Sequence, residues 1–142
     1  MSPTFRHKQL VSAPPERVVA FFHDVSNLLR VSPPFPELRI LSTETRIRPG
    51  AVFPVQVRIG PFQRILHTRI LRVELDGTFI DSIEGGPFER WEHMHRFEPS
   101  GNGTCVLDEI VYTAGRWIGP LAGLALRILF VHRRRAIQKA LS

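Results

Sequence analysis

The sequence is poor in cysteine, and this limits how the fold can be stabilised. Among its 142 residues, Cys105 is the only cysteine. One thiol forms no disulfide within the chain and cannot build a zinc site of the multi-cysteine kind. We therefore expect a protein of the reducing cytoplasm, held together by an apolar core.

Long apolar runs and nucleotide or hydrolase motifs are also missing. The longest apolar run, 121–126, is followed by Arg127, so it falls short of the roughly 20 residues that span a bilayer. Residues 1–9 carry charges but no apolar run of signal-peptide length, so secretion by that route is not expected. No Gly-x-Ser-x-Gly elbow, phosphate loop or dinucleotide fingerprint occurs.

What is present is typical of one folded domain over residues 1–142. The 43% hydrophobic and 23% charged contents are ordinary for a globular protein, which argues against disorder and against a fibrous repeat. A chain of this length buries roughly two thirds of its unfolded surface, enough for one sizeable core.

Closely spaced turn signals divide most of the chain into strands. Asp76-Gly77 is the strongest of them, and we expect a type I′ hairpin turn there. Ser12-Ala13-Pro14-Pro15 and Asp24 indicate helix starts, as does Gly119-Pro120. The sequence therefore predicts strands at 5–11, 38–46, 51–59, 63–75, 78–84, 88–98 and 104–113, helices at 16–22 and 24–30, and a long helix from 119 to about 141.

This order of elements predicts an α+β fold in which a long helix covers one face of an antiparallel sheet. An apolar stripe at helical spacing is expected to face the sheet. It consists of Leu121, Leu124, Ala125, Ile128 and Val131.

Strand 88–98 carries a line of polar residues on its inner face. Its period of two places Trp91, His93, His95 and Phe97 together, and the bulky apolar pair should point inward. Closing the hairpin at 100–103 sets His95 opposite Asp108, His93 opposite Ile110 and Trp91 opposite Tyr112. Similar counting through the turn at Asp76-Gly77 sets Arg72 opposite Asp81.

Buried ions cost several kcal/mol each, so stability alone explains this line poorly. A cavity that orients the polar end of an apolar ligand explains it better, with His95 held by Asp108. The alternative is that the histidine and the aspartate only hydrogen-bond to each other and contact no ligand.

Several residues of the sequence form a pattern that resembles the motifs of a known family. They are Gly86-Pro87-Phe88, then Trp91, His93, His95 and Phe97, then Thr104, Asp108 and Tyr112, with Ser12 to Val18, Phe21 and Asp24 near the start. The pattern resembles the START-like superfamily called SRPBCC, in its polyketide cyclase/dehydrase and lipid-transport branch. The resemblance implies a helix-grip fold, also seen in birch-pollen allergen proteins, in which a seven-stranded sheet grips the last helix around a hydrophobic cavity. It does not fix the chemistry, because the members include carriers, cyclases and receptors.

Two functions remain open at this point. The first, which we favour, is binding or transfer of a small hydrophobic ligand that is lipid-like, polyketide or aromatic. The second is a cofactor-free cyclase or dehydratase in which His95 and Asp108 exchange protons with a ketone. The expected apolar walls are Phe21, Phe53, Val55, Leu66, Ile70, Phe79, Trp91, Phe97, Tyr112, Leu124 and Ile128, and the expected polar strip is Arg72, Asp81, His93, His95 and Asp108.

Neither a metal nor another cofactor is expected. His93, His95 and Asp108 share chemistry with zinc or iron ligands, but no third histidine is fixed nearby by the sequence. The basic cluster at the carboxyl end of the last helix complements the helix dipole, and the alternative is peripheral contact with an anionic membrane. That cluster comprises Arg133, Arg134, Arg135 and Lys139 beside His132. It lacks exposed aromatic neighbours, so nucleic-acid binding is not expected, and the sequence sets no oligomeric state.

Overall fold

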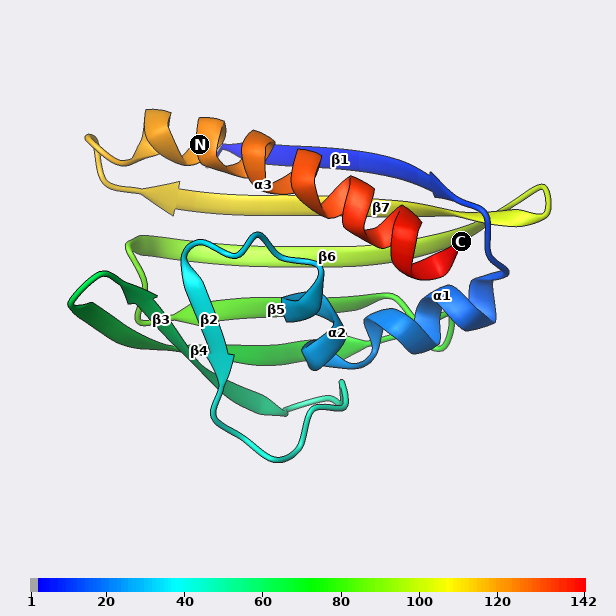
Figure 1. The fold of residues 1–142 in the computed structure, drawn as a ribbon, viewed down its shortest axis with the longest axis horizontal. Helices are drawn as coiled ribbons and strands as arrows, with labels where there is room; N and C mark the ends of the chain where they lie inside the picture. The colour runs from blue at the N-terminus through cyan, green and yellow to red at the C-terminus, as the bar shows by residue number, and fades with distance from the viewer. Residues whose placement is uncertain (1–2) are drawn as a thin grey trace.

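The computed structural model describes residues 3–142 as one seven-stranded antiparallel sheet with three helices in front of it (Figure 1). The strand order is β1-β7-β6-β5-β4-β3-β2. The strands are β1 (Thr4–Val11), β2 (Glu37–Ile40), β3 (Val52–Ile59), β4 (Phe62–Val73), β5 (Phe79–Glu84), β6 (Phe88–Ser100) and β7 (Gly103–Ala114), and the helices are α1 (Pro15–Phe22), α2 (Val25–Arg30) and α3 (Gly119–Leu141). The predicted α+β class and the helix-grip arrangement are confirmed.

The helix starts follow from local chemistry. Proline lies in the first turn of α1 and of α3, where a missing backbone N–H costs nothing. Asp24 caps α2, since its carboxylate accepts a hydrogen bond from the backbone N–H of Ser26 at 2.9 Å. The two short helices thus lie between β1 and β2, as predicted.

The second strand is much shorter than the predicted 38–46. It ends at Ile40, and Arg46 pairs instead with Asp24 in an isolated β-bridge. The Glu44 carboxylate accepts hydrogen bonds from the backbone N–H groups of Thr45 and Arg46 at 3.1 and 3.0 Å. These local bonds compete with strand pairing for the same donors.

The β4–β5 connection differs from the prediction in two ways. Gly77, with φ of 94°, is the only residue of the turn with positive φ, so the turn is not type I′. A bulge between Ile70 and Arg72 also shifts the register, so that Asp81 pairs with Ile70 and Arg72 pairs with Ile80. The extra residue turns Arg72 to the outer face, where it bonds Glu74 at 2.8 Å. The predicted inward position of Arg72 is wrong.

The face of α3 that meets the sheet is not the predicted stripe. Leu124 and Ile128 are 56% and 63% exposed, and Leu121 and Val131 are exposed as well. The first turns of α3 are apolar on every side, so periodicity there does not select a face. The buried face consists of Ala122, Leu126, Phe130, Arg133, Ile137 and Leu141.

Candidate functional site

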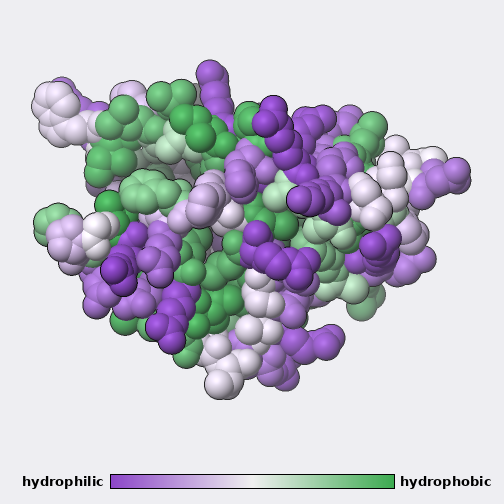
Figure 2. Space-filling view, in the orientation of Figure 1, coloured by the Kyte–Doolittle hydropathy of each residue, from purple (hydrophilic) through white to green (hydrophobic). Residues whose placement is uncertain are grey.

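An apolar groove lies at the end of the molecule where α3 begins. Its volume is about 570 Å³, and it lies between the first half of α3, strand β6 and the segment from α2 to β2. Figure 2 shows hydrophobic side chains gathered over this part of α3, at the upper left. The groove is lined by Ser32, Pro33, Phe35, Pro36, Leu38, Phe88, Trp91, Ala122, Ala125, Leu126, Ile128 and Leu129.

Only Trp91 and Ile128 of the predicted ligand-contacting residues line this groove. Tyr112 packs with Leu126 and Phe130 in a small core beside it. Towards the far end of α3 the space is filled by side chains. Phe53, Ile70, Phe79 and Phe97 are buried there in a closed core with Ile137 and Leu141, and Phe21 packs at its margin.

The remaining predicted wall residues lie elsewhere. Val55 is buried in β3, and Leu66 is half-buried on β4 beside a separate surface depression. Leu124 faces solvent. Half of the groove residues that were not predicted come from the 32–38 segment, whose prolines gave no periodic signal, and most of the others come from α3.

Trp91 provides a polar group in the groove wall. Its indole Nε1 is buried and has no hydrogen-bond partner among the described residues. A buried N–H without a partner is costly, because it has lost its contact with water.

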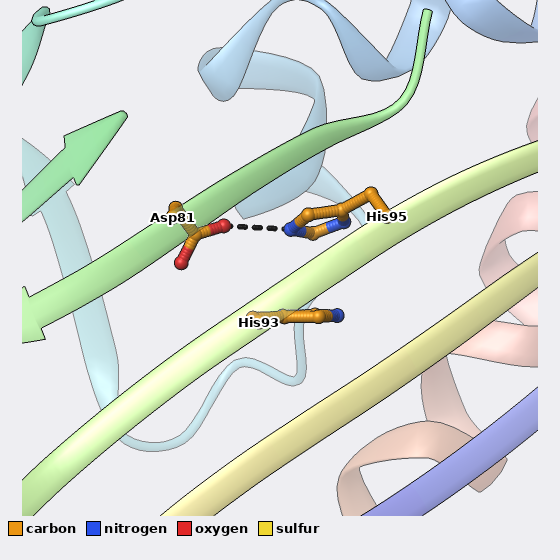
Figure 3. A group of neighbouring side chains, drawn as sticks. All are labelled: Asp81, His93 and His95. Atoms are coloured by element: carbon orange, nitrogen blue, oxygen red, sulfur yellow. Dashed lines mark hydrogen bonds and ion pairs between the residues drawn. The ribbon is translucent and has the colours of Figure 1, made fainter. Parts of the chain in front are cut away.

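A buried polar cluster lies further along the same face of the sheet. The predicted register is confirmed, with His95 opposite Asp108 and His93 opposite Ile110. The hydrogen bonds run diagonally instead. His95 Nε2 bonds Asp81 Oδ2 at 2.6 Å, as Figure 3 shows, and His93 Nε2 bonds Asp108 Oδ1 at 2.7 Å. Asp81, and not Asp108, therefore orients His95.

The imidazole of His95 is enclosed on both faces. It stacks on Phe79 with ring centroids 4.1 Å apart and on His93 with centroids 3.7 Å apart. Its Nδ1 lies 3.7 Å from Asp108 Oδ1, beyond hydrogen-bond distance, and has no partner among the described residues. Burial, together with the nearby His93, lowers the pKa of His95 to about 4, although both aspartates oppose this shift.

Two further residues belong to this cluster and were missed. Arg133 is 7% exposed, its guanidinium lies 5.0 Å from the Phe130 ring, and its Nε has no partner among residues 3–142. Burial lowers the pKa of Arg133, while the Asp108 and Asp81 carboxylates oppose that shift. His7 of β1 lies opposite Asp108, with Nδ1 3.9 Å from Asp108 Oδ2.

These neighbours keep Asp108 ionised. Burial alone would raise the pKa of its carboxyl group, but the His7 and His93 imidazoles and the Arg133 guanidinium outweigh burial and hold that pKa below its usual range. Extending the apolar spacing 126, 130, 137, 141 along α3 would have placed Arg133 on the inner face. Because Arg133 is buried, its inclusion in the alternative membrane-contact cluster is wrong, whereas Arg134, Arg135 and Lys139 are exposed.

One arrangement in the cluster has the composition of a metal site. Asp81, His93 and His95 each offer a ligand atom, and these atoms lie within 4.8 Å of one another (Figure 3). Two imidazoles and a carboxylate suit zinc or iron. The buried Arg133 charge acts on Asp81 and opposes a cation there. The Nε2 atoms of both histidines are already hydrogen-bonded to Asp108 and Asp81, and a metal bound through them would break these bonds. The residues therefore fit a hydrogen-bonded histidine–aspartate network better than a metal site.

None of the helices within residues 3–142, α3 included, is both long enough and apolar enough to cross a bilayer.

Comparison with known proteins agrees with this geometry. The family model described as polyketide cyclase / dehydrase and lipid transport matches residues 11–140. A protein of Chromobacterium violaceum is similar in structure, with a TM-score of 0.77, 17% identity, and coverage of 97% of this chain and 96% of that chain. No curated protein sequence matches.

Two other solved structures share the fold. A START superfamily protein from Mycobacterium smegmatis has a TM-score of 0.75 and 14% identity over 97% of this chain and 96% of its own. The protein Ara h 8.0201 has a TM-score of 0.74 and 14% identity over 99% of this chain and 98% of its own. With a family match over nearly its whole length and this helix-grip architecture, the chain belongs to the polyketide cyclase/dehydrase and lipid-transport family of the START-like SRPBCC superfamily.

Proposed function

We propose that this protein binds a small, largely apolar molecule in the groove between α3, β6 and the 32–38 segment. The observation that carries the proposal is the groove itself. Its volume of about 570 Å³ is walled mostly by apolar side chains, and ligand sites of small molecules typically have 300–1,000 Å³ and such walls. The family includes lipid-transport members, which agrees with a ligand of this character.

The Trp91 indole is the group we propose for orienting the ligand. Its buried N–H has no partner among the described residues, and in this proposal it donates to an oxygen atom of the bound molecule. The histidine–aspartate cluster does not line the groove, because Phe130 packs against His93 one helical turn beyond the groove residue Leu126. The preferred ligand therefore has one carbonyl or hydroxyl group on a hydrophobic body.

The alternative function is acid–base catalysis on a ketone by His95 with an aspartate. The hydrogen bonds of His95 with Asp81 and of His93 with Asp108 favour it. Against it, His95 is covered on both faces by Phe79 and His93. A general base must come within hydrogen-bond reach of the proton it removes. We therefore favour binding without turnover.

The test is to fill the groove and measure binding. Ala125 lines the groove from an exposed helix position, so Ala125→Trp should narrow it without disturbing the core. We expect the Kd for the probe anilinonaphthalene sulfonate to rise roughly tenfold, a loss of about 1.4 kcal/mol. The matched control is Ala20→Trp, an exposed position on α1, which should bind like the wild type. Equal affinity in both variants would overturn the proposal.

A second measurement tests the role of Trp91. Trp91→Phe keeps an aromatic wall but removes the N–H donor. We expect it to weaken binding of a long-chain ketone or alcohol several-fold and to leave binding of the matching alkane nearly unchanged. Equal effects on both ligands would show that the indole N–H does not orient the ligand.

A further inference from the structure

The sheet topology brings several loops to the end of the molecule where the groove opens. In this antiparallel sheet, the β3–β4 turn, the β5–β6 turn and the end of β7 lie at the same end of the strands. Strand β2 begins at that end too, because its first residue, Glu37, pairs with Arg58 near the end of β3. Figure 1 shows the β3–β4 hairpin and the start of α3 on the left of the view. We call this part of the surface, made of residues 33–39, 57–64, 84–90 and 114–128, the groove end.

Three segments of the groove end each expose an aromatic side chain. Phe35, Phe62 and Trp117 are 67%, 76% and 84% exposed. They come from separate segments of the chain, and Phe35 also lines the groove. Single exposed apolar residues are ordinary, but several around one opening mark an interaction surface.

The outer face of α3 continues this apolar surface. Leu121, Leu124 and Ile128 are all more than half exposed and lie at helical spacing on one side. Ile128 also lines the groove, so the exposed face and the groove are continuous. The stripe that was predicted to face the sheet is therefore exposed instead.

The charge around this apolar surface is mainly positive. The groove end contains six arginines and three glutamates. Arg116 and Arg127 flank the apolar face of α3, and Arg64 lies two residues from Phe62. Each arginine near an anionic lipid surface contributes about 1 kcal/mol of attraction.

We propose that the groove end docks on an anionic lipid surface, with Phe35, Phe62, Trp117 and the outer face of α3 at the level of the headgroups. Aromatic rings favour this interfacial layer, and binding there increases with buried apolar area and with attraction to anionic lipid. The groove then opens towards the lipid, from which an apolar ligand is loaded without crossing water.

The charge pattern favours lipid over a second copy of the chain. A symmetric dimer through this surface would bring together two copies of a patch that carries more arginines than glutamates. Like charges at an interface are unfavourable, whereas anionic headgroups complement them. The surface also differs from Arg134, Arg135 and Lys139, which lie towards the opposite end of α3.

The test is sedimentation with vesicles of phosphatidylcholine containing about one third phosphatidylglycerol, with no ligand added. We expect the wild type to bind these vesicles, to bind pure phosphatidylcholine weakly, and to dissociate as salt is raised. Phe62→Ala with Trp117→Ala should weaken binding roughly tenfold. Arg116→Gln with Arg127→Gln should weaken it several-fold and reduce the salt dependence.

Matched controls come from the opposite end of the molecule. Leu75 is fully exposed in the β4–β5 turn, so Leu75→Ala removes an equally accessible apolar side chain elsewhere. Arg135→Gln with Lys139→Gln removes the same number of charges from the end of α3. Both should bind vesicles like the wild type. The proposal is overturned if the controls lose as much vesicle binding as the groove-end variants. It is also overturned if the wild type binds no vesicles and instead forms a dimer that dissociates in Trp117→Ala.

Tryptophan fluorescence gives a second readout. In Trp91→Phe, Trp117 is the remaining tryptophan, and its emission should shift to the blue and be quenched by brominated lipid when vesicles are added. An unchanged spectrum with vesicle-bound protein would contradict the proposed orientation. The inference is independent of the proposed ligand, because docking is measured without a ligand and groove binding without vesicles.

Discussion

The rings of His93 and His95 lie against each other, with centroids 3.7 Å apart and planes 25° from parallel. Each is held by a different aspartate, His93 by Asp108 and His95 by Asp81. Because both rings are buried, two imidazolium charges at this distance would repel each other strongly. The stack therefore favours a neutral His95, and the stability of the protein depends on pH through this pair.

We expect stability to fall as the pH drops from about 6.5 to about 4. The pKa of His95 is lowered from 6.5 to about 4 in the folded protein, so in this window the unfolded chain binds the additional proton. The contribution of His95 is complete above pH 6.5 and is lost progressively below it, on the order of 3 kcal/mol in all. Urea denaturation at a series of pH values measures it.

The variant His95→Gln should flatten this pH dependence while still donating a hydrogen bond to Asp81. Val106→Ala, a buried apolar truncation on β7, is the control and should lower stability equally at every pH. Asp108 contributes in a different window, since its folded pKa lies below the ordinary 3.8 and its stabilisation is lost only below that value. An unchanged slope in His95→Gln would assign the acid sensitivity to other groups.

The turn glycine Gly77 should not tolerate a side chain. Its φ is 94°, and a Cβ built there would lie 2.8 Å from the methyl groups of Val19 on α1. Gly77→Ala should cost about 2 kcal/mol or more, from backbone strain and from the clash. Gly101→Ala also has positive φ but has open space around the Cβ, so it should cost about 1 kcal/mol. Thermal unfolding of both variants gives the comparison, and equal losses would mean that contact with Val19 is unimportant.

Edge strand β1 should control the reactivity of Cys105. This thiol is buried on β7 opposite Leu10, so local opening of β1 should expose it to a reagent. Gln9 ties β1 to α3 by donating from Nε2 to the carbonyl of Arg134 at 2.8 Å. Gln9→Leu removes a bond worth about 1 kcal/mol and should speed labelling about fivefold. Lys8→Leu, an exposed neighbour, should leave the rate unchanged, and a similar increase there would exclude the Gln9 bond as the cause.

The sequence predicted the β6–β7 pairing from Trp91 with Tyr112 to Pro99 with Thr104, but not the register shift between Phe88 and Arg90. A short loop fixes the register of a hairpin, and the period of two then fixes which side chains share a face. It could not predict that the aspartates would bond diagonally, because side-chain rotamers, and not register, choose between His93 and His95. It also could not predict the bulge at 70–72, where no glycine or proline marks the extra residue that turns Arg72 outward.

The inner face of α3 was missed for a different reason. Its first turns are apolar all round, so their sequence is equally compatible with burying Leu126 or Leu124. The basic residues in the second half of the helix predicted a fully solvent-exposed helix end. The buried spacing through Phe130, Ile137 and Leu141 contains Arg133, whose guanidinium enters the polar cluster instead.

Arg133 should therefore contribute more to stability than the other basic residues of α3. Removing its charge leaves the buried Asp81 and Asp108 carboxylates with less compensation. Arg133→Met keeps much of the side-chain volume and should cost about 3 kcal/mol. Arg135→Met, an exposed change on the same helix, should cost less than about 0.5 kcal/mol by urea denaturation.

A double-mutant cycle separates charge from packing. If Arg133 acts through its charge, Asp108→Asn should cost less in the Arg133→Met background than alone, because the neutral amide no longer needs a cation nearby. We expect a coupling of about 1 kcal/mol or more. Strictly additive losses would mean that Arg133 stabilises the fold by packing its stem against Phe130 alone, where the guanidinium lies 5.0 Å from the ring.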